Sequence, residues 1–259
     1  MKVLMEEMTW PEVKERIRPN ALVVMPVAST EQHGPHLPLS TDAELVTQCA
    51  RRAAERVASE IPILVAPTLP FGFSEHHMSF PGTLTLSMPT YLAALTELCE
   101  SLIRHGFRRV LLLNGHGGNQ EVIQVAVRQV VARHNAVVGA ASYWEVAREA
   151  LQAVGVEAVG IVPGHSAGFE TSCMCSLRPG LVHLEAIPQE DQSVPGEHHA
   201  RRTVRAMGVM TVPHVTQNPP TGVWGDPALV RPELGAALVE AIVGALADMF
   251  LAFSRTESY

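Results

Sequence analysis

The sequence of 259 residues lacks the features of a disulfide-stapled or nucleic-acid-binding protein. Its four cysteines have no framework spacing, so we expect reduced cysteines in a cytoplasmic protein: Cys49, Cys99, Cys173 and Cys175. Lys and Arg number 19 against 26 Asp and Glu, a formal charge of −7. Because nucleic acids and anionic membranes favour basic surfaces, neither is expected as a partner. A small-molecule substrate is more compatible with this charge.

Long uninterrupted apolar runs are also lacking. The N-terminus, MKVLMEEMTW, has neither the basic region nor the apolar stretch of a signal peptide. Residues 236–253 are apolar but include Glu240 and Asp248, which predicts an amphipathic helix instead of a membrane span. With 47% hydrophobic residues, the chain is long enough for a single domain, residues 1–259, with a well-buried core.

Short apolar runs alternate with segments of helical periodicity. Four runs are expected to form strands: 21–26, 63–68, 109–113 and 136–141. Six segments are expected to form helices: 9–18, 41–58, 87–105, 119–134, 143–153 and 168–176. This alternation indicates an α/β fold with a parallel sheet covered on both faces. A strand at 207–213 and a long helix over 226–253 are expected in the C-terminal part.

A loop rich in metal-binding residue types follows the first expected strand. Residues 26–42 read PVASTEQHGPHLPLSTD and contain Glu31, His33, His36 and Asp42. Glu31 and His33 are two residues apart, so in an extended segment their side chains point to the same side. Imidazole and carboxylate at this spacing suit Zn²⁺ or Mn²⁺. From this loop alone, a polar loop with satisfied histidines is an equal alternative.

Two further loops have the same character. NGHGGN, at residues 114–119, follows the third expected strand, and its glycines allow close approach to a ligand around His116. Residues 165–172, HSAGFETS, add another histidine and another glutamate. Because ligands bind beyond the carboxyl ends of parallel strands, the three loops predict one convergent metal site.

Four motifs in this order resemble the creatininase (creatinine amidohydrolase) family: EQHGPHLPLSTD, SEHHMSFPGTLTL, NGHGGN and H-x-x-G-x-E-T-S. The resemblance covers residues 24–176. It implies a three-layer α/β/α fold with a mostly parallel central sheet, a hydrolase site with two divalent metal ions (Zn, Mn or Fe), and a homo-oligomer, usually a hexamer.

The resemblance also implies a set of metal ligands: Glu31, His33, Asp42, His116 and Glu170. Asp42 would bridge the ions, since a bidentate anion lowers the repulsion between neighbouring cations. Creatinine-hydrolysing members carry a glutamate where this chain has Gly118, so Glu170 is expected as the fifth ligand, as in other members with NGHGGN. The alternative for Glu170 is a carboxylate that caps a helix or supports a ligand.

His165 is expected to be the catalytic acid and base that protonates the departing amine, because imidazole titrates near neutral pH. A structural histidine at a helix end is the alternative. Six residues are expected to border the substrate: Glu75, His76, Gly117, Gly118, Asn119 and Trp144. Core packing is an equal alternative for Trp144. Asn114 and Asn119 are expected to brace the glycine-rich loop through bonds from side chain to backbone, and Asn119 is the one that can also face the substrate. His36 is expected to support the metal ligands or to pack the first loop, and not to be a sixth ligand. Three other histidines are expected at the surface: His77, His198 and His199.

The expected function is metal-dependent hydrolysis of a C–N bond in an amide or cyclic amide. Gly117 and Ile161 stand where creatinine-hydrolysing members enclose a flat ring with aromatic side chains, which predicts a more open pocket. Formamides, short peptides and cyclic sugar ketones are alternative substrates within the family. From another class, a non-catalytic α/β domain would use NGHGGN as a phosphate-binding loop. For that alternative, the sequence lacks a Walker lysine after the glycines, and the acidic residues of the other loops have no role.

Overall fold

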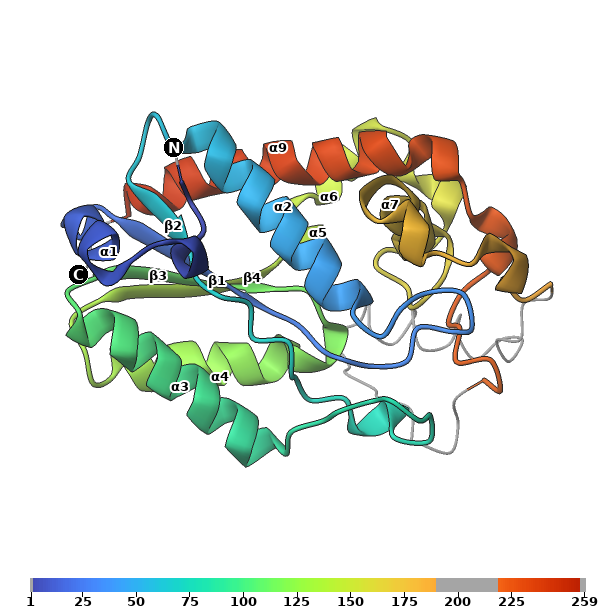
Figure 1. The fold of residues 1–259 in the computed structure, drawn as a ribbon, viewed down its shortest axis with the longest axis horizontal. Helices are drawn as coiled ribbons and strands as arrows, with labels where there is room; N and C mark the ends of the chain where they lie inside the picture. The colour runs from blue at the N-terminus through green and yellow to red at the C-terminus, as the bar shows by residue number, and fades with distance from the viewer. Residues whose placement is uncertain (1, 190–218, 257–259) are drawn as a thin grey trace.

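Four short parallel strands form the central sheet of the computed structural model, which describes residues 2–189 and 219–256 (Figure 1). The strands are β1 (Leu22–Val27), β2 (Ile63–Val65), β3 (Arg109–Asn114) and β4 (Val137–Ser142), in the order β2-β1-β3-β4. All four predicted strands and the α/β class are therefore confirmed. Val27 pairs with Asn114, so the carboxyl ends of β1 and β3 lie side by side.

Helices cover both faces of the sheet, as Figure 1 shows. They are α1 (Trp10–Arg16), α2 (Thr41–Val57), α3 (Met88–Arg104), α4 (Gln120–Val131), α5 (Tyr143–Val146), α6 (Arg148–Ala153), α7 (Gly168–Leu177) and α9 (Gly235–Ser254). Successive strand residues point to opposite faces. Leu22 and Val24 pack in the core that includes α2, α7 and α9, whereas Val23 and Met25 pack in the core that includes α3 and α4. The sheet is therefore the middle of three layers.

Local signals in the sequence begin and end several helices. At α1, the Glu12 carboxylate accepts hydrogen bonds from the backbone N–H and the hydroxyl of Thr9, at 2.7 and 2.9 Å. Ser87 accepts a bond from the Thr90 N–H at the start of α3. Gly106, which follows that helix, has a φ of +109°, a conformation that glycine adopts without strain. These contacts explain why the boundaries of α1 and α3 were predictable.

Two predicted helices have different boundaries in the structure. The long C-terminal helix does not begin near residue 226: two 3₁₀ turns, Pro227–Leu229 and Pro232–Leu234, precede α9, which begins at Gly235. A proline disfavours helical backbone at the residue before it. Arg231, before Pro232, has a φ of −133° and a ψ of 81°, outside the helical region. The segment 143–153 forms two helices joined at Ala147. The predicted strand 207–213, with His198 and His199, lies outside the described residues.

Helix α9 is long and apolar enough to cross a membrane by length and composition, with a mean hydropathy of 2.0 in an 18-residue window. Core helices can have the same composition. Leu238, Ile242, Leu246 and Phe250 of α9 are fully buried, and the helix packs against α2 and α7. Burial of this stripe accounts for the apolar character of the helix.

Replacing Phe250 by alanine is expected to lower the free energy of unfolding by about 3–5 kcal/mol, because it leaves a cavity under α9. Urea titration would measure the change. Asp248→Ala on the exposed side of the same helix is the control, with an expected change within about 0.5 kcal/mol. Equal effects of the two substitutions would contradict the assignment of α9 to the core.

Candidate metal centre

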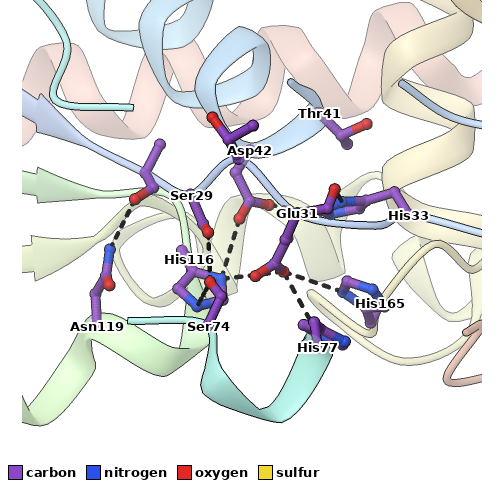
Figure 2. A network of polar contacts seen from close by, with 12 residues as sticks. Ser29, Glu31, His33, Thr41, Asp42, Ser74, His77, His116, Asn119 and His165 are labelled. Atoms are coloured by element: carbon purple, nitrogen blue, oxygen red, sulfur yellow. Dashed lines mark hydrogen bonds and ion pairs between the residues drawn. The ribbon is translucent and has the colours of Figure 1, made fainter. Parts of the chain in front are cut away.

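The predicted metal-binding residues meet beyond the carboxyl ends of β1 and β3 (Figure 2). Glu31 and His33 lie in the loop after β1, and His116 lies in the loop after β3. Asp42 and Glu170 stand in the first turns of α2 and α7. The N-terminus of a helix carries partial positive charge, so this position favours a buried carboxylate.

Asp42 faces two histidines, one with each oxygen. Its Oδ1 lies 3.1 Å from His33 Nε2, and its Oδ2 lies 3.0 Å from His116 Nδ1. Glu31 Oε1 is 3.2 Å from His116 Nδ1, and Glu170 Oε2 is 3.8 Å from His33 Nε2. The five predicted ligands therefore form two groups, Glu31–Asp42–His116 and His33–Asp42–Glu170. Asp42 belongs to both.

Hydrogen bonds on the far side of each ring select the form of imidazole that binds metal. His33 Nδ1 lies 3.2 Å from the Glu31 carbonyl oxygen, and His116 Nε2 lies 3.0 Å from the Phe73 carbonyl oxygen. A carbonyl only accepts hydrogen bonds, so each of these nitrogens carries a hydrogen. In the neutral ring, the lone pair is then on the nitrogen that faces the carboxylates, as a metal ligand requires.

The electrostatics of the cluster favour a bound cation. Burial opposes ionisation of Glu31, yet His116 and His77 outweigh it and hold the pKa of Glu31 well below its usual range. Burial by itself would lower the pKa of His33, but Asp42 raises it to about 9. Burial is the main cause that raises the pKa of Glu170 to about 8. Protons on His33 and Glu170 thus offset the buried negative charge, and a bound cation could take their place.

Three buried carboxylate oxygens support this conclusion. Within residues 2–189 and 219–256, Glu31 Oε1, Glu31 Oε2 and Asp42 Oδ2 have no hydrogen bond of good geometry. Unsatisfied buried oxygens are costly unless something binds them. Carboxylate oxygen with imidazole nitrogen is a donor set for Zn²⁺ or Mn²⁺, so these residues fit a divalent metal.

Additional imidazoles surround Glu31. His165 Nδ1 lies 3.6 Å from Glu31 Oε1, and the His165 side chain is 12% exposed. His77 Nε2 lies 3.5 Å from the same oxygen. The ring centroids of His165 are 4.3 Å from those of both His33 and His77, and the His76 centroid is 4.3 Å from that of His77. Histidine rings thus pack beside the predicted metal groups, and those of His77 and His165 are stacked.

The prediction that His77 lies at the surface is wrong. His77 is 3% exposed, His76 is half-buried and Glu75 is exposed. The 3₁₀ turn Glu75–His77 rotates the second histidine of the pair inward, a local geometry that the sequence did not indicate. The double histidine was the available signal. Contact of Glu75 and His76 with a substrate remains a prediction.

Two asparagines brace the loops. Asn114 accepts a hydrogen bond from the His116 N–H at 3.1 Å and donates one to the His116 carbonyl at 2.7 Å, which confirms the predicted bracing of the glycine-rich loop. Asn119 accepts from the Phe73 N–H at 3.0 Å and donates to the Ala28 carbonyl at 3.2 Å. Asn119 is fully buried, so these contacts tie three segments together. Its predicted contact with substrate remains a prediction.

The first loop and the segment after β4 are also anchored. His36 is fully buried and its Nε2 lies 2.9 Å from Thr171 Oγ1 on α7, in agreement with its predicted packing role. Trp144 is 5% exposed and packs edge-on against Tyr143, with ring centroids 5.1 Å apart. Core packing, the alternative considered for Trp144, is confirmed. Its contact with substrate remains a prediction.

The two glycines after His116 have opposite surroundings. A Cβ atom on Gly118 would lie 2.5 Å from both His116 Nε2 and the Phe73 carbonyl oxygen. A Cβ on Gly117 would meet no heavy atom of the described residues within 4 Å. A glutamate at position 118 would therefore require its neighbours to move, which favours Glu170 as the carboxylate beside His33.

Gly118→Ala is expected to lower the free energy of unfolding by about 1–3 kcal/mol, because the new methyl group collides with backbone and with His116. Gly117→Ala is the matched control and should change it by about 0.5 kcal/mol or less. Urea titration of both variants would measure the difference. An equal loss in the two variants would show that position 118 is not the crowded one.

Comparison with known proteins agrees with this geometry. Residues 6–250 match the creatininase family model, described as creatinine amidohydrolase. The creatinine amidohydrolase of Pseudomonas putida is 30% identical over 261 residues and the match covers 95% of each chain. The mycofactocin precursor peptide peptidase of Mycobacterium ulcerans is 31% identical over 85% of this chain and 76% of its own. The 3-dehydro-scyllo-inosose hydrolase of Thermotoga maritima is 28% identical over 93% and 80%.

Solved structures show the same likeness. A structure described as "Creatininase Mn" and a mutant creatininase of "Zn-Zn type" each give a TM-score of 0.79, at 28% and 27% identity, over 99% of this chain and 100% of theirs. The sequence match, the shared fold and the two groups of buried ligands agree with one another. The chain belongs to the creatininase family of metal-dependent hydrolases.

Proposed function

We propose that this protein is a metal-dependent amidohydrolase that cleaves a C–N bond of an amide or cyclic amide with a water activated at a dinuclear site. The position of Asp42 is the observation that carries the proposal, because its two oxygens face His33 and His116 at 3.1 and 3.0 Å. A carboxylate shared in this way suits two neighbouring cations. Glu31 and His116 would complete one site, and His33 and Glu170 the other.

Two bound divalent ions lower the pKa of a water molecule and polarise the bond to be cleaved. The chain itself provides orientation and proton transfer. His165 stands beside Glu31 and is partly exposed, so it can reach both the metal groups and a substrate. We assign it the transfer of a proton to the departing nitrogen. Asn114 and the crowded Gly118 hold His116 in position.

The substrate class is the less constrained part of the proposal. The relatives include a creatinine amidohydrolase, a peptide peptidase and a hydrolase of 3-dehydro-scyllo-inosose, so the family does not share one scissile bond. The open space at Gly117 leaves the pocket wider than one that encloses the flat ring of creatinine, which favours other amides and lactams as substrates. Formamides, short peptides and cyclic sugar ketones belong in the same screen.

We also propose that the protein acts in the cytoplasm as a homo-oligomer. Its four cysteines are free and three are buried, as expected of a reduced protein. Large apolar side chains are exposed along one stretch of the chain: Phe71, Met78, Leu84 and Met88. These four exposed apolar side chains, within residues 71–88, support contact with another subunit.

Elemental analysis of protein that has been stripped with chelator and reloaded would test the metal site first. We expect about two equivalents of Zn, Mn or Fe per wild-type chain, the loss of both in Asp42→Ala, and the loss of one in Glu170→Gln. Glu44→Ala is the control, since Glu44 lies on the same helix but binds Arg178 at 2.9 Å. Two equivalents in Asp42→Ala would refute the bridging role, and none in the wild type would refute the proposed function.

His165→Gln is expected to retain the full metal content and to lower kcat by about 10²–10⁴-fold, because the departing nitrogen loses its proton donor. The measurement is the turnover of whichever amide, formamide or lactam the screen identifies. His105→Gln, at the exposed end of α3, is the control. An unchanged kcat in His165→Gln would leave this histidine with a structural role alone.

A further inference from the structure

Gln32 lies between two predicted metal ligands in the sequence, and its side chain contacts two other histidines. It is 5% exposed. The Gln32 Nε2 atom lies 2.8 Å from His165 Nε2, 3.0 Å from His77 Nδ1 and 3.0 Å from the Gly222 carbonyl oxygen. One carboxamide therefore joins segments after β1, before α3, before α7 and before α9.

Two backbone groups determine which way this carboxamide points. Its Oε1 accepts a hydrogen bond from the Gly34 N–H at 2.9 Å, and its Nε2 donates to the Gly222 carbonyl. The reversed amide would oppose N–H to N–H at Gly34 and oxygen to oxygen at Gly222. Gly222 has a φ of +74° and lies against the amide, where a side chain would overlap Gln32. The amide nitrogen must therefore face the two imidazoles.

The orientation of the amide determines where each imidazole carries its hydrogen. An amide nitrogen only donates, so a ring nitrogen at 2.8–3.0 Å from it must present a lone pair. The amide nitrogen has two hydrogens and three neighbouring acceptors, so one acceptor receives no hydrogen bond. A ring at that position still turns its lone pair toward the amide, because a ring N–H there would point at another N–H group. In the neutral rings the hydrogens are then on His165 Nδ1 and His77 Nε2, the atoms 3.6 and 3.5 Å from Glu31 Oε1.

Four of the histidines around Glu31 thus divide into two classes. His33 and His116 donate to backbone carbonyls and turn lone pairs toward the carboxylates. His77 and His165 turn lone pairs toward the Gln32 amide nitrogen and N–H groups toward Glu31. All four have a nitrogen close enough to the acidic groups to bind a metal, yet only the first two have a lone pair there.

We propose that Gln32 is a positioning residue that holds His165 and His77 as N–H donors toward Glu31 and thereby excludes them from the metal-ligand set. If the proposed function is correct, the Nδ1–H of His165 and the Nε2–H of His77 are hydrogen-bond donors to Glu31 or to a substrate oxygen. The proton that His165 passes to the departing nitrogen is the one that the attacking water loses and the ring takes up, so the ring is neutral before and after. Both donor roles require the tautomer that Gln32 selects.

The direct test is ¹⁵N magic-angle-spinning NMR of the full chain labelled in histidine and loaded with Zn²⁺. The nitrogen shifts distinguish a protonated from an unprotonated Nδ1 or Nε2, and His165→Gln and His77→Gln assign the signals. We expect hydrogens on His165 Nδ1 and His77 Nε2 in the wild type. A hydrogen on His165 Nε2 would overturn the proposal without any variant having to fold.

Gln32→Glu adds a test of cause. The carboxylate retains the acceptor for the Gly34 N–H but turns an acceptor toward both rings, so the hydrogens of His77 and His165 should move to the nitrogens that face residue 32. Unchanged tautomers would overturn the positioning role. On an identified amide substrate, kcat should fall by about 10²-fold or more with a smaller change in KM. Reversed tautomers with an unchanged kcat would overturn the catalytic part of the proposal.

Gln48→Glu makes the same substitution on α2, where Gln48 accepts a hydrogen bond from Arg51 at 3.0 Å, and should change neither tautomers nor turnover. The NMR measurement does not depend on a substrate. If no C–N bond is cleaved but the tautomers are as expected, the proposed function fails and the role of Gln32 stands. If turnover is found with the opposite tautomers, the reverse holds.

Discussion

Compensation of buried negative charge is the constraint on which this structure depends. Glu31, Asp42 and Glu170 are almost inaccessible to solvent. Asp42 lies in one group with Glu31 and in another with Glu170, and within each group the potential ligand atoms are no more than 4.8 Å apart. Ionised carboxylates in such a place are costly unless they are paired. His33 and His116 pair with them through nitrogens whose opposite sides are held by backbone carbonyls. The cluster is therefore stable only while protons or cations occupy the space between these groups, and a divalent metal meets that requirement.

The α/β fold supplies the positions that this cluster needs. Parallel pairing of β1 with β3 ends at Val27 and Asn114, so the loops that follow start next to each other. Helices α2 and α7 bring Asp42 and Glu170 to the same place at their N-termini, where the helix dipoles favour negative charge. Two hydrophobic cores, one on each face of the sheet, pack behind these elements and hold the loops in place.

The same arrangement explains how one family can act on different bonds. The predicted metal ligands come from the carboxyl ends of strands and the first turns of helices, and the solved relatives share this fold. Positions such as Gly117, where a side chain would meet open space, can change without disturbing the core, and contact with substrate is predicted there. Gly118 is different, because crowding at that position affects His116 directly. Function is thus local to the site while the fold is common.

Much of this protein could be predicted from residue types and their periodicity. Buried parallel strands are continuous apolar runs, so all four strands were found to within about three residues at their ends. The three loops that carry the predicted ligands follow strands or begin helices, positions that the alternation of elements already implied. The start of α9 and the break between α5 and α6 were missed, since packing against distant segments decides them. For Trp144 the sequence left core packing and a pocket wall as equal alternatives, and only tertiary packing beside Tyr143 places it in the core.

The sequence by itself determined the class of fold, the order of its elements and the residue types available to hold a metal, because these depend on local patterns along the chain. Only the tertiary structure decided that His77 is buried, that Asp42 faces two histidines, and which nitrogen of each ring points inward. Those features depend on contacts such as that of Gln32 with His165, 133 residues away. A hydrogen bond between groups so far apart exists only after folding has brought them together.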